Sequence, residues 1–415
     1  MLRLDVLRTL DSLRRIEPEW RELHVEARAS FANSPTWLTA WWDTMRDAGP
    51  LPFRDRELLA VAIRDGAGAL VGLALFVRRW VRVALVPRLR LEALGTGEPK
   101  EDEVCTDYPT VLARAEHRAE VVEVLAQALL SGELGRWDEL QMSTMRRDDP
   151  VVDLFVQAFV RARVGVSVEP SPAATAVKLA PTFDGYLATL PKKHRYAVKR
   201  TLSDFEAWAN ERGGSTFERV GSRAELAAGV RTLIELHAAR WGPRHLFTSE
   251  RFRRFHEQVM ASLIDGVDGR LDLWILRAGG EPVAALYNIV CGRVVNNYQG
   301  GRLVDLPKGI KPGMVANLRA IQRAIAEGLA EYDFLPGEAL YKHQLGNLAR
   351  PVVTLNVSRS DTRAVGLELF SAGIRRIATS VGLAHDKPAP SSRPRDSRPG
   401  DSRPGDWGPR DPERG

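Results

Sequence analysis

Cysteine is scarce in this sequence: only two of its 415 residues, Cys105 and Cys291, are cysteines. A disulfide framework needs more cysteines than this, and so does a zinc site of the four-cysteine type. We therefore expect neither kind of site. Both side chains are interpreted as ordinary thiols of a protein in a reducing compartment.

Long apolar runs are missing as well. The sequence contains no run of about 18 apolar residues, which a transmembrane helix would need. Charged side chains such as Arg3, Asp5 and Arg8 interrupt the N-terminal segment, where a signal peptide would carry its apolar core. We therefore expect a cytoplasmic protein without a transmembrane segment.

The motifs of several enzyme classes do not occur. There is no Gly-x4-Gly-Lys-Ser/Thr phosphate loop and no Gly-x-Ser-x-Gly nucleophile motif. His256-Glu257 begins like a zinc-protease motif, but Met260 stands where the second histidine ligand is required. The other histidines are scattered, so we expect no metal.

Basic residues outnumber acidic ones, which gives a net charge of +6 and an isoelectric point near 9.4. Such a balance favours anionic partners, such as nucleic acid, anionic lipid or a phosphate-bearing cofactor. Spread over 415 residues, the charge does not select one of them.

The C-terminal segment, residues 386–415, is rich in Pro, Arg, Asp, Ser and Gly, and its pentapeptide Asp396–Gly400 repeats at once as Asp401–Gly405. Such a segment has almost no apolar surface to offset its ordering entropy, so it is expected to be disordered. It is either a passive tail or a binding segment.

Two parts of the chain share one pattern. Each has a strand, a glycine-bearing turn and a second strand, which predicts a β-hairpin. The first set is Leu58–Arg64, Asp65–Gly68 and Leu70–Val77, and the second is Leu271–Arg277, Ala278–Glu281 and Pro282–Val290.

Each hairpin is followed by a strand, a helix and a strand that begins near an acidic residue. These are Leu89–Leu94, Glu116–Leu130 and Trp137–Met142 in the first part, and Val294–Gln299, Gly313–Leu329 and Tyr332–Leu335 in the second. Further helices are expected at Val151–Arg163, Phe183–Leu190, Lys192–Arg212, Arg223–Arg240 and Ser249–Ile264. The pattern predicts an α+β protein with mixed, largely antiparallel sheets flanked by helices.

The chain is expected to form two related domains, residues 1–170 and 175–385, followed by the tail at 386–415. We place the boundary in a proline- and alanine-rich stretch, Glu169–Ala174.

A basic, glycine-bearing turn, Lys308–Gly313, precedes the periodic helix of the second half. A helix start exposes free backbone N–H groups, and glycines such as Gly309 and Gly313 let a ligand approach the backbone. With Lys308 and Lys311 adding positive charge, the turn can bind a pyrophosphate. The alternative is a loop with no ligand.

Several short motifs follow one another in the order found in a known family. In the second half they are Phe183-x-x-Tyr-Leu187, the basic helix from Lys192, His237-Ala-Ala-Arg-Trp241, Pro312-Gly313, Tyr332-Asp-Phe334 and Gly337-x-x-x-Tyr-Lys342, and in the first half Phe31–Trp37 and Asp107-Tyr108. Over roughly residues 15–360 the chain resembles GNAT acetyltransferases of the CelD/BcsL type, named for cellulose and exopolysaccharide biosynthesis. Its two-part layout also resembles the FemAB-type aminoacyltransferases, which are tandem GNAT folds.

The resemblance implies two tandem GNAT-like domains, of which the first is possibly degenerate, and direct acyl transfer from acetyl-CoA or another acyl-CoA. The donor would bind the turn Lys308–Gly313 and lie between two splayed strands, Val294–Gln299 and Tyr332–Leu335. The donor-binding candidates are Gln299, Gly300, Lys308, Gly309, Lys311, Pro312 and Gly313. The turn keeps the family's glycine and charge but not its Arg/Gln-x-x-Gly-x-Gly/Ala spacing, so an aminoacyl-tRNA donor stays open.

Direct transfer needs a base for the acceptor and an acid for the thiolate. Glu338 is the candidate base, and the alternative is a solvated loop carboxylate. Tyr341 or Tyr298 is the candidate acid, unless each is a packed aromatic. Asp333 is expected to orient a neighbour or to have a structural role.

The acceptor candidates are His237, Arg240 and Trp241 on one helix. Lys342 is expected either to contact an anionic donor or substrate or to close a salt bridge. The competing interpretation gives Trp241 a place in the core and Arg240 a place in solvent. We expect the acceptor to be a sugar, a glycan precursor or another small metabolite.

Two other functions stay open: a FemAB-like, aminoacyl-tRNA-dependent transferase, and a non-catalytic binding protein with this fold. The first would use a basic surface, for which Lys192, Arg195 and Lys199 on one helical face are candidates. Such a run is otherwise a solvated helix face. No DNA partner is expected.

Overall fold

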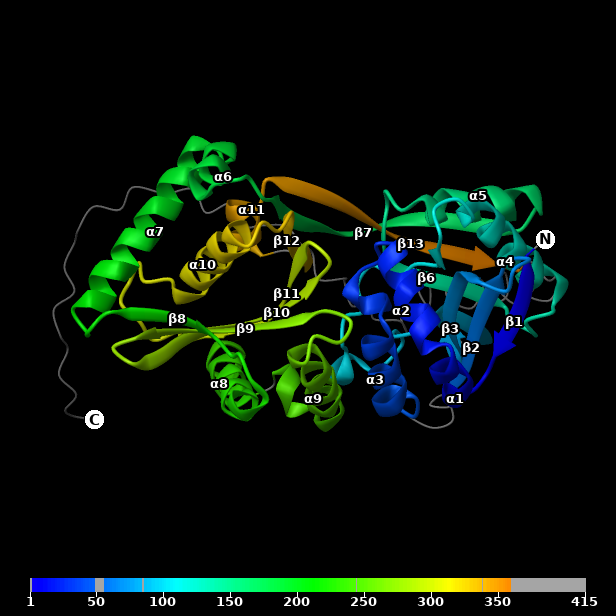
Figure 1. Ribbon diagram of the computed structural model, residues 1–415, viewed down its shortest axis with the longest axis horizontal. Coiled ribbons are helices and arrows are strands. Elements are labelled where there is room, and N and C mark those ends of the chain that lie inside the picture. The colour runs from blue at the N-terminus through cyan, green and yellow to red at the C-terminus, as the bar shows by residue number, and fades with distance from the viewer. Residues whose placement is uncertain (1, 49–55, 84–85, 244, 338, 360–415) are drawn as a thin grey trace, which may run out of the picture. The chain divides into compact units, whose positions relative to one another are not determined.

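One β-sheet runs through both halves of the chain (Figure 1). The computed structural model describes residues 2–48, 56–83, 86–243, 245–337 and 339–359. Its strands are β1 (Arg3–Leu7), β2 (Arg56–Arg64), β3 (Leu70–Val83), β4 (Val86–Ala93), β5 (Leu112–Ala113), β6 (Glu139–Arg146), β7 (Gly165–Lys178), β8 (Ser215–Arg219), β9 (Arg270–Ala278), β10 (Glu281–Cys291), β11 (Val294–Arg302), β12 (Glu331–Pro336) and β13 (Leu348–Ser358). The sheet order is β1-β2-β3-β4-β6-β13-β7-β12-β11-β10-β9-β8, with β5 beside β3.

Helices cover both faces of this sheet. They are α1 (Leu10–Arg15), α2 (Glu17–Glu26), α3 (Pro35–Met45), α4 (Arg118–Ser131), α5 (Pro150–Arg161), α6 (Phe183–Thr189), α7 (Lys192–Asn210), α8 (Arg223–Trp241), α9 (Glu250–Ile264), α10 (Pro312–Ala326) and α11 (Leu340–Leu345). One hydrophobic cluster under α2, α3, α8 and α9 extends through both halves. On the other face α4 and α5 form a second cluster, and α7 and α10 a third.

The two halves repeat one architecture. We call residues 2–161 the N-terminal half and residues 183–346 the C-terminal half. The predicted hairpins are confirmed, because β2 pairs with β3 and β9 pairs with β10, both antiparallel. In each half the next strand then pairs in parallel with a strand that follows a helix, β4 with β6 and β11 with β12.

The halves exchange their last strands. β7 follows the N-terminal half in sequence but pairs with β12 of the C-terminal half, whereas β13 follows the C-terminal half and pairs with β6 of the N-terminal half. β7 and β13 also pair with each other from end to end, Gly165 with Ser358 and Ala176 with Leu348. Separating the halves would therefore break three ladders of backbone hydrogen bonds.

The stretch Glu169–Ala174 belongs to β7. The domain boundary predicted there falls within a strand, and the division into residues 1–170 and 175–385 stays a prediction. Pro170 and Pro172 are tolerated because β12 pairs with β7 only from Ala174 onward, so the proline segment has a neighbour on one side alone. The predicted tail lies outside the described residues.

The contact between α3 and α9 joins the halves on the shared face. Trp37 of α3 packs edge-on against Phe255 of α9, with ring centroids 4.7 Å apart. The sequence signals for α3 are Ser34, whose side chain accepts a hydrogen bond from the Trp37 amide, and Pro35 in the first turn. None of the described helices is long and apolar enough to cross a membrane.

We predict that Gly301→Ala destabilises the protein, because a Cβ atom at Gly301 would lie 2.3 Å from the backbone nitrogen of His237 in α8. Overpacking of this kind costs roughly 1–3 kcal/mol, which thermal unfolding will register as a lower midpoint. Gly66→Ala is the control, since a Cβ there meets nothing within 4 Å. Equal midpoints for the two variants would contradict the close packing of α8 on β11.

Candidate active site where the two halves meet

Asp333 makes β12 turn away from β11. The two strands pair over only three positions, the last being Asn296 with Asp333. Beyond this point the Asp333 carboxylate accepts a hydrogen bond of 2.7 Å from the amide of Leu335, whose φ of 59° is left-handed. This side-chain turn bends the backbone and opens a gap between the strands.

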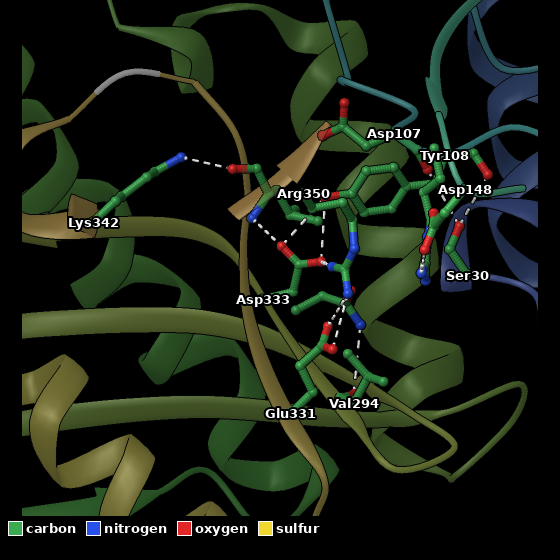
Figure 2. A network of polar contacts seen from close by, with 12 residues as sticks. Ser30, Asp107, Tyr108, Asp148, Val294, Glu331, Asp333, Lys342 and Arg350 are labelled. Atoms are coloured by element: carbon green, nitrogen blue, oxygen red, sulfur yellow. Dashed lines mark hydrogen bonds and ion pairs between the residues drawn. The ribbon is translucent and has the colours of Figure 1, made fainter. Parts of the chain in front are cut away.

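A buried ion pair fixes the same carboxylate. Arg350 of the exchanged strand β13 contacts Asp333 through one nitrogen and Glu331 through another, the latter at 2.7 and 2.9 Å (Figure 2). Burial alone would lower the pKa of Arg350, but the two carboxylates outweigh it and raise that pKa. The guanidinium therefore stays charged, and Asp333 is held as its partner.

The N-terminal half reaches this pair through Tyr108, whose hydroxyl donates to Asp333 at 3.2 Å (Figure 2). Tyr108 ends the bridging segment, which we define as residues 104–108. At its other end the carbonyl of Val104 accepts a 2.5 Å hydrogen bond from Tyr298 of β11. Cys105 and Tyr108 have left-handed φ values of 47° and 63°, a strain that is common at functional sites.

Asp107 lies in the middle of the bridging segment and is 7% exposed. Burial and the nearby Asp333 raise its pKa to about 8, while Lys342 opposes this shift. Among the described residues, none donates a hydrogen bond to the Asp107 carboxylate. A carboxyl group with a pKa in this range suits proton transfer near neutral pH.

Two cavities adjoin the bridging segment. The central cavity, of about 700 Å³, is lined by residues of both halves, among them Tyr108, Arg146, Cys291, Asp333 and Arg350. The N-half cavity, of about 320 Å³, is lined by Arg90, Glu98, Cys105, Asp107, Gln141 and Thr144 among others. Asp107 therefore faces the smaller cavity, whereas Tyr108 faces the larger one.

The predicted donor turn lies ahead of α10, as the sequence suggested. Lys308 and Lys311 are exposed, Gly309 is left-handed with φ of 101°, and Pro312 begins the helix. The helix start has no side-chain cap. Gly313 lies against Arg302, whose Cδ would be 2.9 Å from a Cβ at that position.

The two candidate acids lie in different surroundings. Tyr298 is buried in the shared core, where its hydroxyl donates to the carbonyl of Val104 and lies 3.1 Å from His256 Nε2. Tyr341 is partly buried at the edge of the Phe334 ring. Burial raises the pKa of Tyr341, and the Arg240 charge opposes that shift.

The predicted acceptor residues are split between core and surface. His237 is buried against β11, where it contacts Gln299, and desolvation lowers its pKa to about 4. Gly300 follows Gln299 in the same strand. The expectation that Trp241 faces the core is wrong: Trp241 is 57% exposed at the end of α8 and stacks with Arg240, whose Cζ lies 4.5 Å from the ring centroid.

Lys342 of α11 faces the junction. Its Nζ donates to the carbonyls of Leu335 and Pro336 at 3.1 Å each. Burial lowers its pKa, while Asp107 and Asp333 oppose this effect. Glu338, the base expected from the sequence, lies outside the described residues.

Sequence reasoning missed two residues of this site. Asp107 was noticed only as part of a short motif, and Arg350 was not noticed at all. The signal for Arg350 is that it is the one charged residue of the strand Leu348–Ser358. In the part of the chain that the structure describes, no cluster of three histidine, cysteine or acidic side chains could hold a metal ion.

Comparison with known proteins agrees with this architecture. Residues 192–343 match the family model of the acetyltransferase (GNAT) domain. No curated protein matches the chain. Among solved structures, FemX is similar in fold at 10% identity, with 88% of this chain and 99% of that chain covered and a TM-score of 0.53.

Two further structures show weaker likeness. The C-terminal domain of a putative lysylphosphatidylglycerol synthetase from Agrobacterium fabrum has 11% identity, covers 87% of this chain and 96% of its own, and gives a TM-score of 0.48. A tandem GNAT protein from the clavulanic acid biosynthesis pathway has 14% identity, coverage of 86% and 100%, and a TM-score of 0.43.

Residues 192–343 thus carry an acetyltransferase (GNAT) domain, and the repeated architecture of the two halves is a tandem GNAT-like fold, which supports an acyltransferase.

We predict that Asp107→Asn changes the pH dependence of stability. The folded-state pKa of Asp107 is about 8, above its unfolded value, so the folded state binds the extra proton and stability falls as pH rises between the two values. Asparagine does not ionise, so the variant does not lose stability in this way as the pH rises. The unfolding midpoint of the variant should therefore rise relative to wild type between about pH 5 and about pH 8. Exposed Glu101→Gln is the control, and a pH-independent difference for Asp107→Asn would contradict the assignment.

Proposed function

We propose that this protein transfers an acyl group from acetyl-CoA, or another acyl-CoA, to an amine or hydroxyl of a small acceptor. The observation that carries the proposal is the gap between β11 and β12 beside the start of α10. The resemblance to the CelD/BcsL type supports a sugar or glycan precursor as the acceptor, with a role in polysaccharide biosynthesis.

The donor is proposed to bind the C-terminal half. Lys308 and Lys311 supply positive charge in solvent, and no described residue forms an ion pair with either. The uncapped first turn of α10 offers backbone N–H groups to the same phosphates. Gln299, Gly300 and the gap beyond Asp333 then lie in the path of the pantetheine arm.

The chemistry needs proton transfer and little else, because a thioester is already activated. We propose Asp107 as the base, since the charges of Asp333 and Lys342 are near enough to affect its pKa and no described residue donates a hydrogen bond to its carboxylate. Tyr341 is the proposed acid for the leaving thiolate. Lys342 uses two of its three N–H groups on carbonyls, which leaves one for a developing oxyanion.

The acceptor would reach the gap past Arg240 and Trp241. An exposed indole with a stacked guanidinium offers a flat surface that suits a sugar ring. His237 lies below them and is proposed to hold Gln299 in place rather than to contact the acceptor, because it is 2% exposed.

A tRNA-dependent transferase is the second candidate. The observation in its favour is α7, where Lys192 and Lys199 are exposed. Arg195, the third cation of that face, donates instead to the carbonyls of Ala188 and Leu190. Part of its guanidinium is therefore engaged within the protein, which leaves fewer N–H groups for a phosphate.

The first experiment compares donors by thermal unfolding. A ligand that binds the folded state raises the midpoint, so acetyl-CoA should produce a clear shift. The double charge reversal of Lys308 and Lys311 to Glu should abolish the shift, whereas the same change at Lys192 and Lys199 should leave it intact. No shift with any acyl-CoA would reject this donor. tRNA binding that falls steeply with salt and is lost in the α7 variant would favour the second candidate.

The second experiment identifies the base. Asp107→Asn should lower turnover by about 10²–10⁴-fold with little change in the acetyl-CoA shift, because a base acts on the acceptor. Glu338→Gln is the matched comparison, since it tests the candidate expected from the sequence. Full turnover in Asp107→Asn, with a large loss in Glu338→Gln, would move the assignment to Glu338.

A further inference from the structure

The central cavity lies between the two halves, where β11 and β12 begin. Its walls come from the end of α2, the starts of α4 and α5, the turn between β10 and β11, and the exchanged strand β13. The volume of about 700 Å³ is within the range of pockets that bind small molecules. Asn296 and Asp333, the last residues paired before the gap between β11 and β12, also line it. The cavity therefore adjoins the candidate active site.

The cavity is rich in arginine. Among the described residues, its lining holds five arginines and no lysine, together with four carboxylates. Two of the arginines are paired within the protein. Arg350 is held by its two carboxylate partners, as described above, and Arg146 contacts Asp148 at 2.7 and 2.9 Å. These pairs use three of the four carboxylates.

The other three arginines lack a charged partner. Among the described residues, none forms an ion pair or a side-chain hydrogen bond with Arg28 or Arg118, and Arg293 donates to the carbonyl of Gly328 at 2.9 Å. The remaining carboxylate of the lining, Asp149, accepts a hydrogen bond from a first-turn amide of α5. Three arginines against one carboxylate leave an excess of two positive charges in the cavity.

Arg28 occupies a backbone position that favours glycine. It follows the end of α2 with φ of 51°, and the next amide, that of Ala29, donates to the carbonyl of His24 at 3.3 Å. Helices often end with a left-handed residue at this place, and it is usually glycine because a Cβ atom is disfavoured there. An arginine at this position costs stability, and no described side chain is its partner. This combination is typical of a residue kept for binding.

The chemistry of the lining selects the ligand. A guanidinium group is planar and donates pairs of hydrogen bonds to a carboxylate or a phosphate. Arg28 and Arg118 belong to the N-terminal half and Arg293 belongs to the C-terminal half, so an anion between them contacts both halves. Apolar side chains, such as Val111 and Val151, form other parts of the wall. The ligand that matches this lining has two negative charges on oxygen and an uncharged body.

We propose that the central cavity is a second ligand site, separate from the donor gap, and that it binds a small organic dianion through Arg28, Arg118 and Arg293. The dianion is a phosphate monoester or a dicarboxylate, since both present oxygen atoms to guanidinium groups. The inference does not depend on the proposed donor, because the turn at Lys308–Gly313 does not line this cavity. A bound dianion links the two halves beside Asp333.

Arginine modification of the full-length protein tests the proposal. Phenylglyoxal reacts with guanidinium groups, and peptide mass spectrometry gives the rate at each arginine. The probes are glucose 6-phosphate and succinate. Glucose serves as the neutral analogue, acetate as the monoanion and sodium chloride as the control for ionic strength. The internal control is Arg231, an exposed arginine of α8 that has no ion-pair partner among the described residues.

A dianion at ten times its dissociation constant should slow the modification of Arg28, Arg118 and Arg293 by about tenfold, because the rate follows the empty fraction of the site. Arg231 should react at its original rate. Glucose, acetate and sodium chloride should protect none of these arginines. The probe that protects at the lower concentration identifies the charged group of the ligand as phosphate or carboxylate.

The variant Arg28→Gly separates binding from folding. It removes one guanidinium, so about tenfold more dianion should be needed to protect Arg118 and Arg293. Without ligand, its unfolding midpoint should equal or exceed that of the wild type, because glycine suits the left-handed position. Arg231→Gln is the matched control and should change neither measurement. A lower midpoint for Arg28→Gly would show a structural role for this side chain and contradict the proposal.

Four further results would overturn it: no protection beyond that of sodium chloride, equal protection by glucose or acetate, equal slowing at Arg231, or protection that Arg28→Gly does not weaken. Acetyl-CoA distinguishes this site from the donor site. It should raise the unfolding midpoint and leave the three arginines reactive, and their protection by acetyl-CoA would reject a separate site. Protection by a dianion without any acetyl-CoA shift would reject the donor and keep this site.

Discussion

The interaction between Asp333 and Arg350 sets the geometry of the site. The Asp333 carboxylate is buried, and a buried charge is tolerated only when it is paired and hydrogen-bonded. Here the partner, Arg350, comes from β13, a strand that the C-terminal half gives to the sheet of the other half. The bend of β12, the ion pair to the exchanged strand and the Tyr108 contact therefore all involve this one side chain.

The two halves differ in what lies between their diverging strands. In the N-terminal half, Arg79 contacts Glu92 and Arg90 contacts Glu139 beside β4 and β6. The C-terminal splay lies beside an uncapped helix start and two exposed lysines. The C-terminal half therefore offers positive charge and free backbone N–H groups beside its diverging strands, whereas these two arginines of the N-terminal half are engaged in internal ion pairs.

Local patterns in the sequence predicted local structure well. The two hairpins and the periodic helix at Pro312–Ala326 followed from spacing and turn residues alone. The pairing of β7 with β12 and β13 could not be predicted in this way, because it joins segments more than a hundred residues apart. In addition, the prolines of β7 favour a loop in the local sequence. The same holds for Trp241: helical position fixes its direction, but only the tertiary packing of α8 decides which direction is solvent.

The same contrast between local sequence patterns and tertiary packing applies to the site residues. Lys342 and Asp333 were found because they sit in motifs next to a predicted strand, whereas Asp107 acquires its raised pKa from burial and from Asp333, 226 residues away in the sequence. The surroundings of Asp107 are made by the bridging segment, which contacts Tyr298 and Asp333 of the C-terminal half and exposes Asp107 to the N-half cavity. A residue whose pKa depends on contacts between the two halves cannot be recognised from the local sequence of either half.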